Sequence, residues 1–364
     1  METNNKKASV VIASILKPVD DTRMFEKMGA TLADNGYQVF IIGQPTDYTP
    51  VYTGIEFKAT QRVNRVSIGR LLLPLKVLRK IIKLKPEYII ANTHELLIVS
   101  LLNRIIFGSK IIYDIRENYY RNIRFAETYP FGFRLFLALW VRLWEKVTSL
   151  FVHHFFIAEK AYQRELGFLG KRFTVLENKA LLPQGFIAQR EVTEFKLLFS
   201  GTLAKSTGVF QAIDLAEKLH AINGKVRLTI IGYSALHKVS TEMVRKTVDK
   251  PFITILGLHQ PVSHKRIMKE IAKANFGIIY YPPSRHTEGS MPTKLYEYLA
   301  CQLPILTWPR QRFTDFILKH KAGLIIGPDL RELIHEMSTQ PFYQQPIPDI
   351  YWEGKKMVEA IQNL

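Results

Sequence analysis

Lys294 and Glu297 lie three residues apart in SMPTKLYEYLACQLP, a largely apolar segment that covers residues 290–304. In a helix this spacing places both side chains on one face, one turn apart. The helix would begin after the turn GSMP, and the first turn of a helix presents backbone N–H groups that suit an anion. The pair has the chemistry to hold a phosphorylated ligand, although a solvated ion pair on a surface helix has the same spacing.

A second segment with phosphate-binding chemistry is SGTLAKSTG, at residues 200–208, which connects a predicted strand to a predicted helix. Backbone N–H groups of a glycine-containing loop and of a helix N-terminus can meet phosphate oxygens, and the lysine supplies positive charge. The segment matches neither the Walker A pattern nor GxGxxG. Taken alone, it is equally consistent with an ordinary turn.

Strand-like and helix-like segments alternate along the whole chain, which predicts parallel sheets that are covered by helices on both faces. The series starts again at FKLLFSG, after a stretch near residues 180–194 where the periodicity fades. We therefore predict an α/β fold with two doubly wound, Rossmann-like domains that face a central cleft. The predicted divisions are residues 1–185, residues 186–345 and a final helical segment, residues 346–364.

The most informative loops of the second half each follow a predicted strand. These loops are SGTLAKSTG, GYS, GLHQP and PPSRHTEGSMP. Ligands of open parallel sheets bind at the carboxyl ends of the strands. The four loops should therefore converge on one edge of one sheet, close to the helix that carries Lys294.

The charge of the chain is high and unevenly placed. The 364 residues carry a net charge of +18, and the run from Arg62 to Lys85 contains eight Lys or Arg and no Asp or Glu. In SIGRLLLPLKVLRKIIKLKP the basic residues alternate with Leu and Ile at helical spacing, which is typical of an amphipathic helix on an anionic membrane. Because no zinc-finger spacing and no RNP-like signature is present, we expect no nucleic-acid partner.

Other features limit the possible classes of protein. The single cysteine, Cys301, excludes an internal disulfide, and its apolar surroundings in the sequence predict a core position. We expect no signal peptide and no membrane-spanning segment. The aromatic segment at residues 129–144 is predicted, taken alone, to be a core helix, with a membrane interface as the alternative. No cluster of His, Cys and Asp has the spacing of metal ligands, so we predict no metal.

From Phe199 to Leu306 the sequence resembles the family 4 glycosyltransferases of the GT-B fold, and the resemblance extends over nearly the whole chain. It rests on the glycine loop, the strand end TIIG, the turn GLH and the sequence LYEYLACQLPIL. The last segment, YWEGKKMVEAIQNL, looks like the family's final helix, which crosses back to the N-terminal domain. The resemblance implies a retaining enzyme that uses a nucleotide sugar as donor and requires neither a metal nor another cofactor.

The resemblance also implies roles for individual residues of the second half. Glu297 aligns with the glutamate that accepts hydrogen bonds from ribose hydroxyls, a role that suits an ionised carboxylate. Lys294 would reach the diphosphate from the same helix turn, so that the pair holds a ribose and a phosphate side by side. The implied donor-binding residues are Gly201, Thr202, Lys205, Thr207, Leu258, His259, Ser290, Met291, Lys294 and Glu297.

The sequence departs from the family pattern at two places. Thr202 and Thr207 stand where the family loop usually carries Arg and Lys, and Lys205 is expected to supply the missing charge. The family also has two glutamates eight residues apart, whereas Glu288 precedes Glu297 by nine. We expect Glu288 to be catalytic through the donor sugar, with the backbone N–H groups of residues 290 and 291 as the alternative.

The N-terminal half carries weaker marks of the family. Asp21 and Arg23 follow the first predicted strand and would lie on the acceptor side. His94 would hydrogen-bond the transferred sugar, or it is a structural polar residue at a strand end. Glu117 would orient the acceptor hydroxyl, or it is a partner of a helix N-terminus. Arg116 stands where the family commonly has His.

The favoured function is glycosyl transfer from a nucleotide diphosphate sugar to a glycan or polyprenyl-linked acceptor, in synthesis of a bacterial surface polysaccharide. Residues 1–185 would bind the acceptor and an anionic membrane surface, and residues 186–345 would bind the donor. The protein would work in the cytoplasm, peripherally on the inner face of the cell membrane. Two alternatives remain: a sugar-nucleotide epimerase on the same fold, and a non-catalytic, degenerate relative that acts as a membrane-bound partner.

Overall fold

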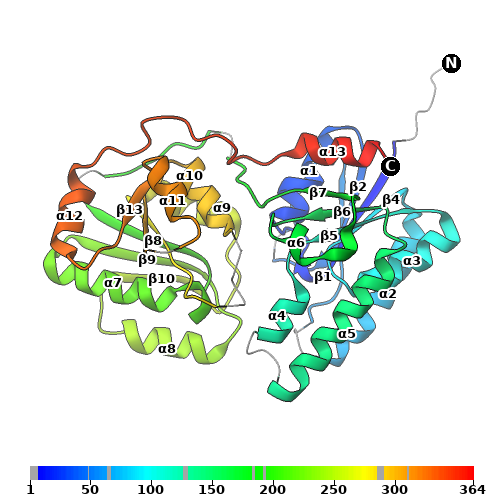
Figure 1. Cartoon of the computed structure of the whole chain (residues 1–364), viewed down its shortest axis with the longest axis horizontal. Helices are drawn as coiled ribbons and strands as arrows, with labels where there is room; N and C mark the ends of the chain where they lie inside the picture. Colours follow the sequence, from blue (N-terminus) through cyan, green and yellow to red (C-terminus); the bar gives the residue numbers. More distant parts are fainter. Residues whose placement is uncertain are drawn as a thin grey trace. The chain divides into compact units, whose positions relative to one another are not determined.

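The chain forms two compact units in its computed structural model (Figure 1). Unit 1 comprises Met1–Asn178 and Trp352–Leu364, and unit 2 comprises Lys179–Tyr351. These boundaries lie a few residues from the predicted divisions at 185 and 345. The structure describes residues 7–47, 49–63, 67–125, 130–182, 185–191, 194–284, 291–309 and 311–364.

Unit 1 is built on a seven-stranded sheet with the order β3-β2-β1-β4-β5-β6-β7. All six neighbouring pairs of strands are parallel. The strands are β1 (Ser9–Pro18), β2 (Gln38–Gln44), β3 (Ile55–Ala59), β4 (Tyr88–Ala91), β5 (Lys110–Ile115), β6 (His154–Ile157) and β7 (Phe173–Val175). Central strands such as β1 are apolar throughout because both faces of the sheet are covered. Val11 and Ala13 enter one core, whereas Val10 and Ile12 enter the other.

Helices cover both faces of this sheet. One core contains residues of α2 (Ile68–Leu84) and α3 (Leu96–Phe107), and α5 (Phe131–Ser149) packs against α3 and against α4 (Tyr119–Phe125). The short α6 (Tyr162–Glu165) and η2 (Gly167–Leu169) lie on this side as well. The other core contains residues of η1 (Arg23–Gly29), α1 (Ala30–Asp34) and α13 (Gly354–Gln362).

The helical segment after β1 begins as a π-helical turn, η1, that continues into α1, and the carboxylate of Asp21 accepts the N–H groups of Arg23 and Met24. The prediction that the aromatic segment forms a core helix is wrong. In α5 the large apolar side chains point outward, and Phe131 and Trp140 are 81% and 56% exposed.

Unit 2 contains a six-stranded parallel sheet with the order β10-β9-β8-β11-β12-β13. Its strands are β8 (Phe195–Thr202), β9 (Val226–Tyr233), β10 (Ile253–Leu258), β11 (Phe276–Ile279), β12 (Ile305–Thr307) and β13 (Gly323–Ile325). Its helices are η3 (Lys205–Thr207), α7 (Val209–Ile222), α8 (His237–Thr247), α9 (His264–Lys273), α10 (Thr293–Ala300), α11 (Thr314–Lys319) and α12 (Leu330–Thr339).

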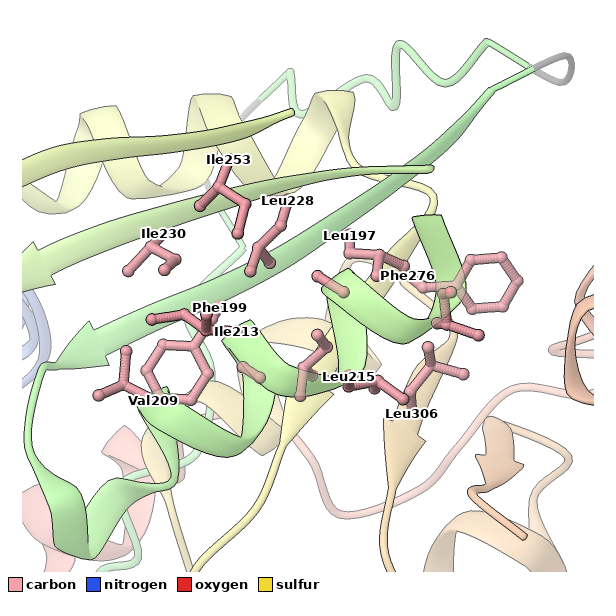
Figure 2. Close-up of a cluster of buried hydrophobic side chains, with 14 of the residues drawn as sticks. Leu197, Phe199, Val209, Ile213, Leu215, Leu228, Ile230, Ile253, Phe276 and Leu306 are labelled. Atoms are coloured by element: carbon pink, nitrogen blue, oxygen red, sulfur yellow. The ribbon is translucent and has the colours of Figure 1, made fainter. Parts of the chain in front are cut away.

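Alternation along the strands again fills two cores in unit 2. Figure 2 shows one of them, in which Leu197 and Phe199 of β8 pack with Leu228 of β9 and with Ile213 of α7. The second core lies on the opposite face and contains residues of α9, α10 and α11. Burial of each such side chain contributes about 1.5–3 kcal/mol, so the sheet is held firmly from both sides.

Both sheets reverse their strand order next to their first strand, between β1 and β4 in unit 1 and between β8 and β11 in unit 2. The prediction of two doubly wound, Rossmann-like domains is therefore confirmed. In such sheets the ligand site lies at the carboxyl ends of the strands that flank this switch point. Among the described residues, no helix is both long enough and apolar enough to span a membrane.

Candidate functional site

Helix α10 begins directly beside the switch point of unit 2 and carries Lys294 and Glu297 in its first turns. Both side chains are buried, with exposed fractions of 6% for Lys294 and 8% for Glu297. A solvated surface ion pair would leave both side chains in water, so that interpretation is wrong. Two ionisable groups are instead held out of water at the edge where a ligand of this fold binds.

Lys294 is enclosed by aromatic rings. Its Nζ lies 3.7 Å from the centre of the Phe199 ring and 5.6 Å from the centre of the Tyr281 ring. Within the part of the chain that the structure describes, this ammonium has no hydrogen-bond partner. Burial lowers the pKa of Lys294 to about 7, against the opposing effect of Glu297. A buried ammonium without hydrogen bonds is unfavourable by itself, and an anionic ligand would relieve it.

Glu297 is oriented by a histidine that the sequence analysis missed. Its Oε1 lies 3.1 Å from Nε2 of His264, the first residue of α9. An ionised carboxylate only accepts hydrogen bonds, so Nε2 of His264 is the donor. A signal was present in the sequence, because SHKRI opens a helix on the same edge of the sheet, directly after the loop that follows β10.

The glycine loop follows β8 and depends on close backbone packing. Gly201 has a φ of 103°, and a Cβ at this position would meet nothing within 4 Å, so the space beside it is open. At Gly208 a Cβ would lie 2.6 Å from the carbonyl oxygen of Tyr280. At Gly232 of β9 it would lie 1.8 Å from the carbonyl oxygen of Gly201. Residues without Cβ thus allow the loop to lie against its neighbouring strands.

The side chains of Thr207 and Lys205 in this loop have partners inside unit 2. The Thr207 hydroxyl accepts the N–H of Ala204 at 3.1 Å and lies 2.7 Å from the carbonyl oxygen of Thr202, so it closes the loop on itself. Lys205 forms an ion pair with Glu242 of α8 at 2.9 Å. Exposed pairs of this kind are weak. The predicted phosphate contact of Lys205 would therefore require this pair to open.

The other predicted donor-binding residues lie between the end of β10 and the start of α10. Leu258 ends β10 with a φ of 63°, and its carbonyl oxygen accepts the N–H of Ser234 at 2.9 Å. His259 follows it, with its ring 6.4 Å from that of His237. Met291 is half-buried directly before α10. Glu288 and Ser290 lie outside the described residues, so their predicted roles stay predictions.

Unit 1 also gathers polar residues at the carboxyl edge of its sheet. The guanidinium of Arg116, after β5, donates to both oxygens of Asp21 at 2.7 and 3.1 Å. Burial raises the pKa of Asp21, but Arg116 outweighs it and holds this pKa below its usual range. Glu117 accepts a hydrogen bond from the Asn122 side chain at 2.8 Å.

His94 follows β4 on the same edge. Its ring lies 4.7 Å from the ring of Tyr119, and its Nδ1 lies 3.4 Å from Oε2 of Glu95. Glu95 also accepts a hydrogen bond from Nε of Arg70 at 2.9 Å. Burial lowers the pKa of His94, so the imidazole is neutral near pH 7. A neutral imidazole can both donate and accept a hydrogen bond.

Arg23 requires a correction. The sequence analysis placed it on the acceptor side, but its side chain is 1% exposed and is fully engaged inside unit 1. It donates to Asp114 at 2.9 Å and to the carbonyl oxygen of Leu176 at 2.8 Å. A guanidinium that is buried and paired in this way is part of the framework and cannot meet an acceptor. The sequence showed an arginine next to a strand end but not its partner Asp114 on β5.

Comparison with known proteins gives one match to a protein family. Residues 185–341 match the protein-family model described as glycosyl transferases group 1. A search of curated proteins finds no match to the chain.

Several solved structures share the fold. Sucrose-phosphate synthase from Thermosynechococcus elongatus is 13% identical, with a TM-score of 0.71 over 98% of this chain and 99% of that one. HepE from Anabaena, in complex with UDP and glucose, is 13% identical, with a TM-score of 0.63 over 98% and 99%. WaaG, a glycosyltransferase involved in lipopolysaccharide biosynthesis, is 15% identical, with a TM-score of 0.62 over 91% and 90%. The chain thus shares the GT-B fold of these structures, and residues 185–341 are similar to the glycosyl transferases group 1 family.

Proposed function

We propose that this protein transfers a sugar from a nucleotide diphosphate sugar to a glycan or lipid-linked glycan acceptor. The proposal is supported by the group 1 domain and by the ligands of structures with the same fold. The HepE structures contain UDP or UDP-glucose, and starch synthase IV from Arabidopsis thaliana is bound to ADP. In this proposal unit 2 binds the nucleoside diphosphate of the donor.

The observation that carries the proposal is the buried ammonium of Lys294. It lies at the switch point of the sheet, 3.7 Å from the Phe199 ring, without a hydrogen-bond partner among the described residues. A donor diphosphate would supply that partner and would raise the pKa of Lys294 again. In the transition state negative charge builds up on the leaving diphosphate, and a preorganised cation in a low-dielectric site stabilises it strongly.

The neighbouring groups fit the rest of a nucleotide. Glu297, held by His264, would accept hydrogen bonds from the ribose hydroxyls. The open space at Gly201 allows a phosphate to approach the backbone N–H groups of the loop. These contacts bind and orient the donor, and neither requires a metal or another cofactor.

The acceptor would bind at the carboxyl edge of the sheet in unit 1, near Asp21, Glu117 and the neutral His94. Retention is proposed from the resemblance to family 4. We favour attack on the same face from which the diphosphate leaves, with the acceptor hydroxyl giving its proton to a leaving phosphate oxygen. The C–O bond to the acceptor forms as the C–O bond to the diphosphate breaks, so the atoms and charges balance.

The biological setting is part of the same proposal. A lipid-linked acceptor of bacterial surface polysaccharide synthesis would place the enzyme in the cytoplasm, on the inner face of the cell membrane. The support is the acid-free basic run of α2, since each basic residue near an anionic leaflet contributes about 1 kcal/mol. Two alternatives remain. An epimerase would convert a nucleotide sugar without an acceptor, and a non-catalytic relative would not convert it at all.

A ligand screen followed by a transfer assay tests the proposal. Nucleoside diphosphates should raise the melting temperature of the protein, because a ligand at 100 times its Kd stabilises the native state by about 2.7 kcal/mol. Glu297→Ala should abolish the shift, and the melting temperature of the free variant shows whether it is folded. Nucleotide sugars should then be consumed only in the presence of an acceptor. Turnover without an acceptor would favour the epimerase, and a folded protein that responds to no nucleoside diphosphate would overturn the proposal.

A further inference from the structure

Helix α5 exposes its large apolar side chains and buries polar ones. The buried side of the helix carries Ala138, Val141, Glu145 and Thr148, which include a carboxylate and a hydroxyl. The exposed side carries Phe136, Trp140, Leu143 and Val147, spaced by four, three and four residues along one face. A helix that faces water normally shows the opposite distribution.

The apolar surface continues onto the neighbouring helices. Helix α3 packs against both α2 and α5 (Figure 1). On α3, Ile98, Leu102 and Ile105 are exposed at spacings of four and three. At the start of α2, Leu71, Leu72 and Leu75 are exposed as well. We call these residues the apolar face: Leu71, Leu72, Leu75, Ile98, Leu102, Ile105, Ile106, Phe107, Phe131, Phe133, Leu135, Phe136, Leu139, Trp140, Leu143 and Val147.

Positive charge accompanies this face. Lys76, Arg79 and Lys83 of α2 are exposed, and so is Lys146 of α5. The three helices contain one acidic residue, Glu145, which is buried and accepts a hydrogen bond from the Tyr113 hydroxyl at 2.8 Å. The surface of α2, α3 and α5 therefore combines large apolar side chains with basic groups and offers no exposed carboxylate.

This combination identifies the partner. So many exposed large apolar side chains on three neighbouring helices are unusual for a monomeric soluble protein, and such clusters mark interaction sites. A second copy of the chain would bring two sets of like charges together, which opposes association. An anionic lipid surface offers negative headgroups to the basic residues and an apolar interior to the Phe, Leu and Ile side chains, and Trp prefers the boundary between them.

We propose that the apolar face inserts into the headgroup and outer acyl region of an anionic bilayer, with the basic residues of α2 contacting the headgroups. The inference deepens the proposed function and rests on it only for the purpose of docking, namely delivery of a lipid-linked acceptor. Insertion itself requires no donor and no catalysis. It also differs from adsorption through the basic run alone, because apolar burial persists when salt screens the charges.

Sedimentation with vesicles tests the insertion in the full chain. The protein should bind vesicles of phosphatidylcholine mixed with an equal amount of phosphatidylglycerol, and high salt should weaken this binding without abolishing it. The variant Phe136→Gln, Trp140→Gln, Leu143→Gln should bind roughly tenfold or more weakly. A matched control changes the exposed residues Val51, Leu236 and Val248 to Gln, which lie outside the apolar face, and should bind like the wild type.

A site-specific probe gives the depth of insertion. Cys301 is the single cysteine and is buried, so Phe136→Cys can be labelled selectively with an environment-sensitive fluorophore. Its emission should shift to the blue when the mixed vesicles are added, whereas a label at Val248→Cys should not respond. An unchanged emission at position 136, or wild-type binding by the triple Gln variant, would overturn the inference. A wild-type dimer that the triple variant converts to a monomer would overturn it too, in favour of a second copy.

The same variants separate this inference from the proposed function. Nucleoside diphosphate binding takes place in unit 2 and should be the same in the wild type and in the triple Gln variant. Vesicle binding without any nucleoside diphosphate binding would leave the inference standing and remove the proposed function. Nucleoside diphosphate binding without vesicle binding would overturn the inference and leave the proposed function standing.

Discussion

Nε2 of His264 donates a hydrogen bond to Oε1 of Glu297 across 3.1 Å, although the two residues are 33 positions apart in the chain. The contact joins the first turn of α9 to the middle of α10, so two helices that follow different strands meet at one carboxylate. A hydrogen bond to an ionised group restricts the orientation of that group. His264 therefore positions Glu297, and Glu297 is the group that would touch the ligand.

We expect His264→Ala to weaken ligand binding through Glu297. A hydrogen bond to a charged group contributes about 1.5–3 kcal/mol, so roughly a tenfold rise in Kd is expected for a nucleoside diphosphate. Because Glu297 is proposed to hold the ribose, the loss should be similar for a nucleoside and for its diphosphate. His264→Gln keeps a donor and should restore part of the affinity. Isothermal titration with both ligands measures this, and a loss confined to the diphosphate would contradict it.

Lys294→Met should separate the two halves of the nucleotide. Met fills a similar volume without charge, so the variant should lose affinity for nucleoside diphosphates far more than for nucleosides. The Kd values of both ligands are measured in the wild type, in Lys294→Met and in His264→Ala. Lys294→Met should lose affinity mainly for the diphosphate, whereas His264→Ala should lose similar affinity for both ligands. Equal losses for both ligands in Lys294→Met would show that Lys294 acts on the shape of the site instead.

The same variant should change how stability depends on pH. Burial lowers the pKa of Lys294 from 10.5 to about 7, so between these values the unfolded chain binds a proton that the folded protein does not. The free energy of unfolding of the wild type should therefore rise with pH through this window, relative to Lys294→Met. Below pH 7 the variant should be the more stable of the two. Urea unfolding at several pH values decides the matter, and a constant difference between the proteins would contradict it.

The sequence predicted the architecture because strands and helices leave periodic patterns that do not depend on distant contacts. It also placed Lys294 and Glu297 on one helix face, since that relation is local. It could not show that Lys294 is buried, because its surroundings include Phe199 of β8 and Tyr281, which follows β11. The partners His264 of Glu297 and Asp114 of Arg23 are likewise set by the order of the strands.

The exposed face of α5 was predicted wrongly for a related reason. A helix with many aromatic residues is usually buried, and the sequence alone does not reveal which side of it meets the protein. Val141 and Glu145 turn inward because Glu145 meets Tyr113 of β5, and Trp140 is left outside. Composition alone therefore does not distinguish a buried helix from one that exposes its aromatic side.

Gly232→Ala should disturb the glycine loop. A Cβ at Gly232 would lie 1.8 Å from the carbonyl oxygen of Gly201, and its φ of 155° is unfavourable for other residues. Both effects require the loop to move, and overpacking of this kind costs about 1–3 kcal/mol. Gly224→Ala is the matched control, since a Cβ there meets nothing within 4 Å. Thermal unfolding and nucleoside diphosphate titration should both show a defect in Gly232→Ala and none in Gly224→Ala.

Arg23 and Asp114 should behave as a framework pair and not as part of an acceptor site. Removal of one partner from a buried ion pair leaves the other charge unpaired, which costs about 3–5 kcal/mol, so Arg23→Met should strongly destabilise the protein. Asp114→Leu in the same chain removes the stranded carboxylate and should recover much of that loss. The single and double variants can be compared by urea unfolding, together with the KM for the acceptor in the fraction that remains folded. A stable Arg23→Met protein with a raised acceptor KM would contradict the framework role and support the acceptor role that the sequence predicted for Arg23.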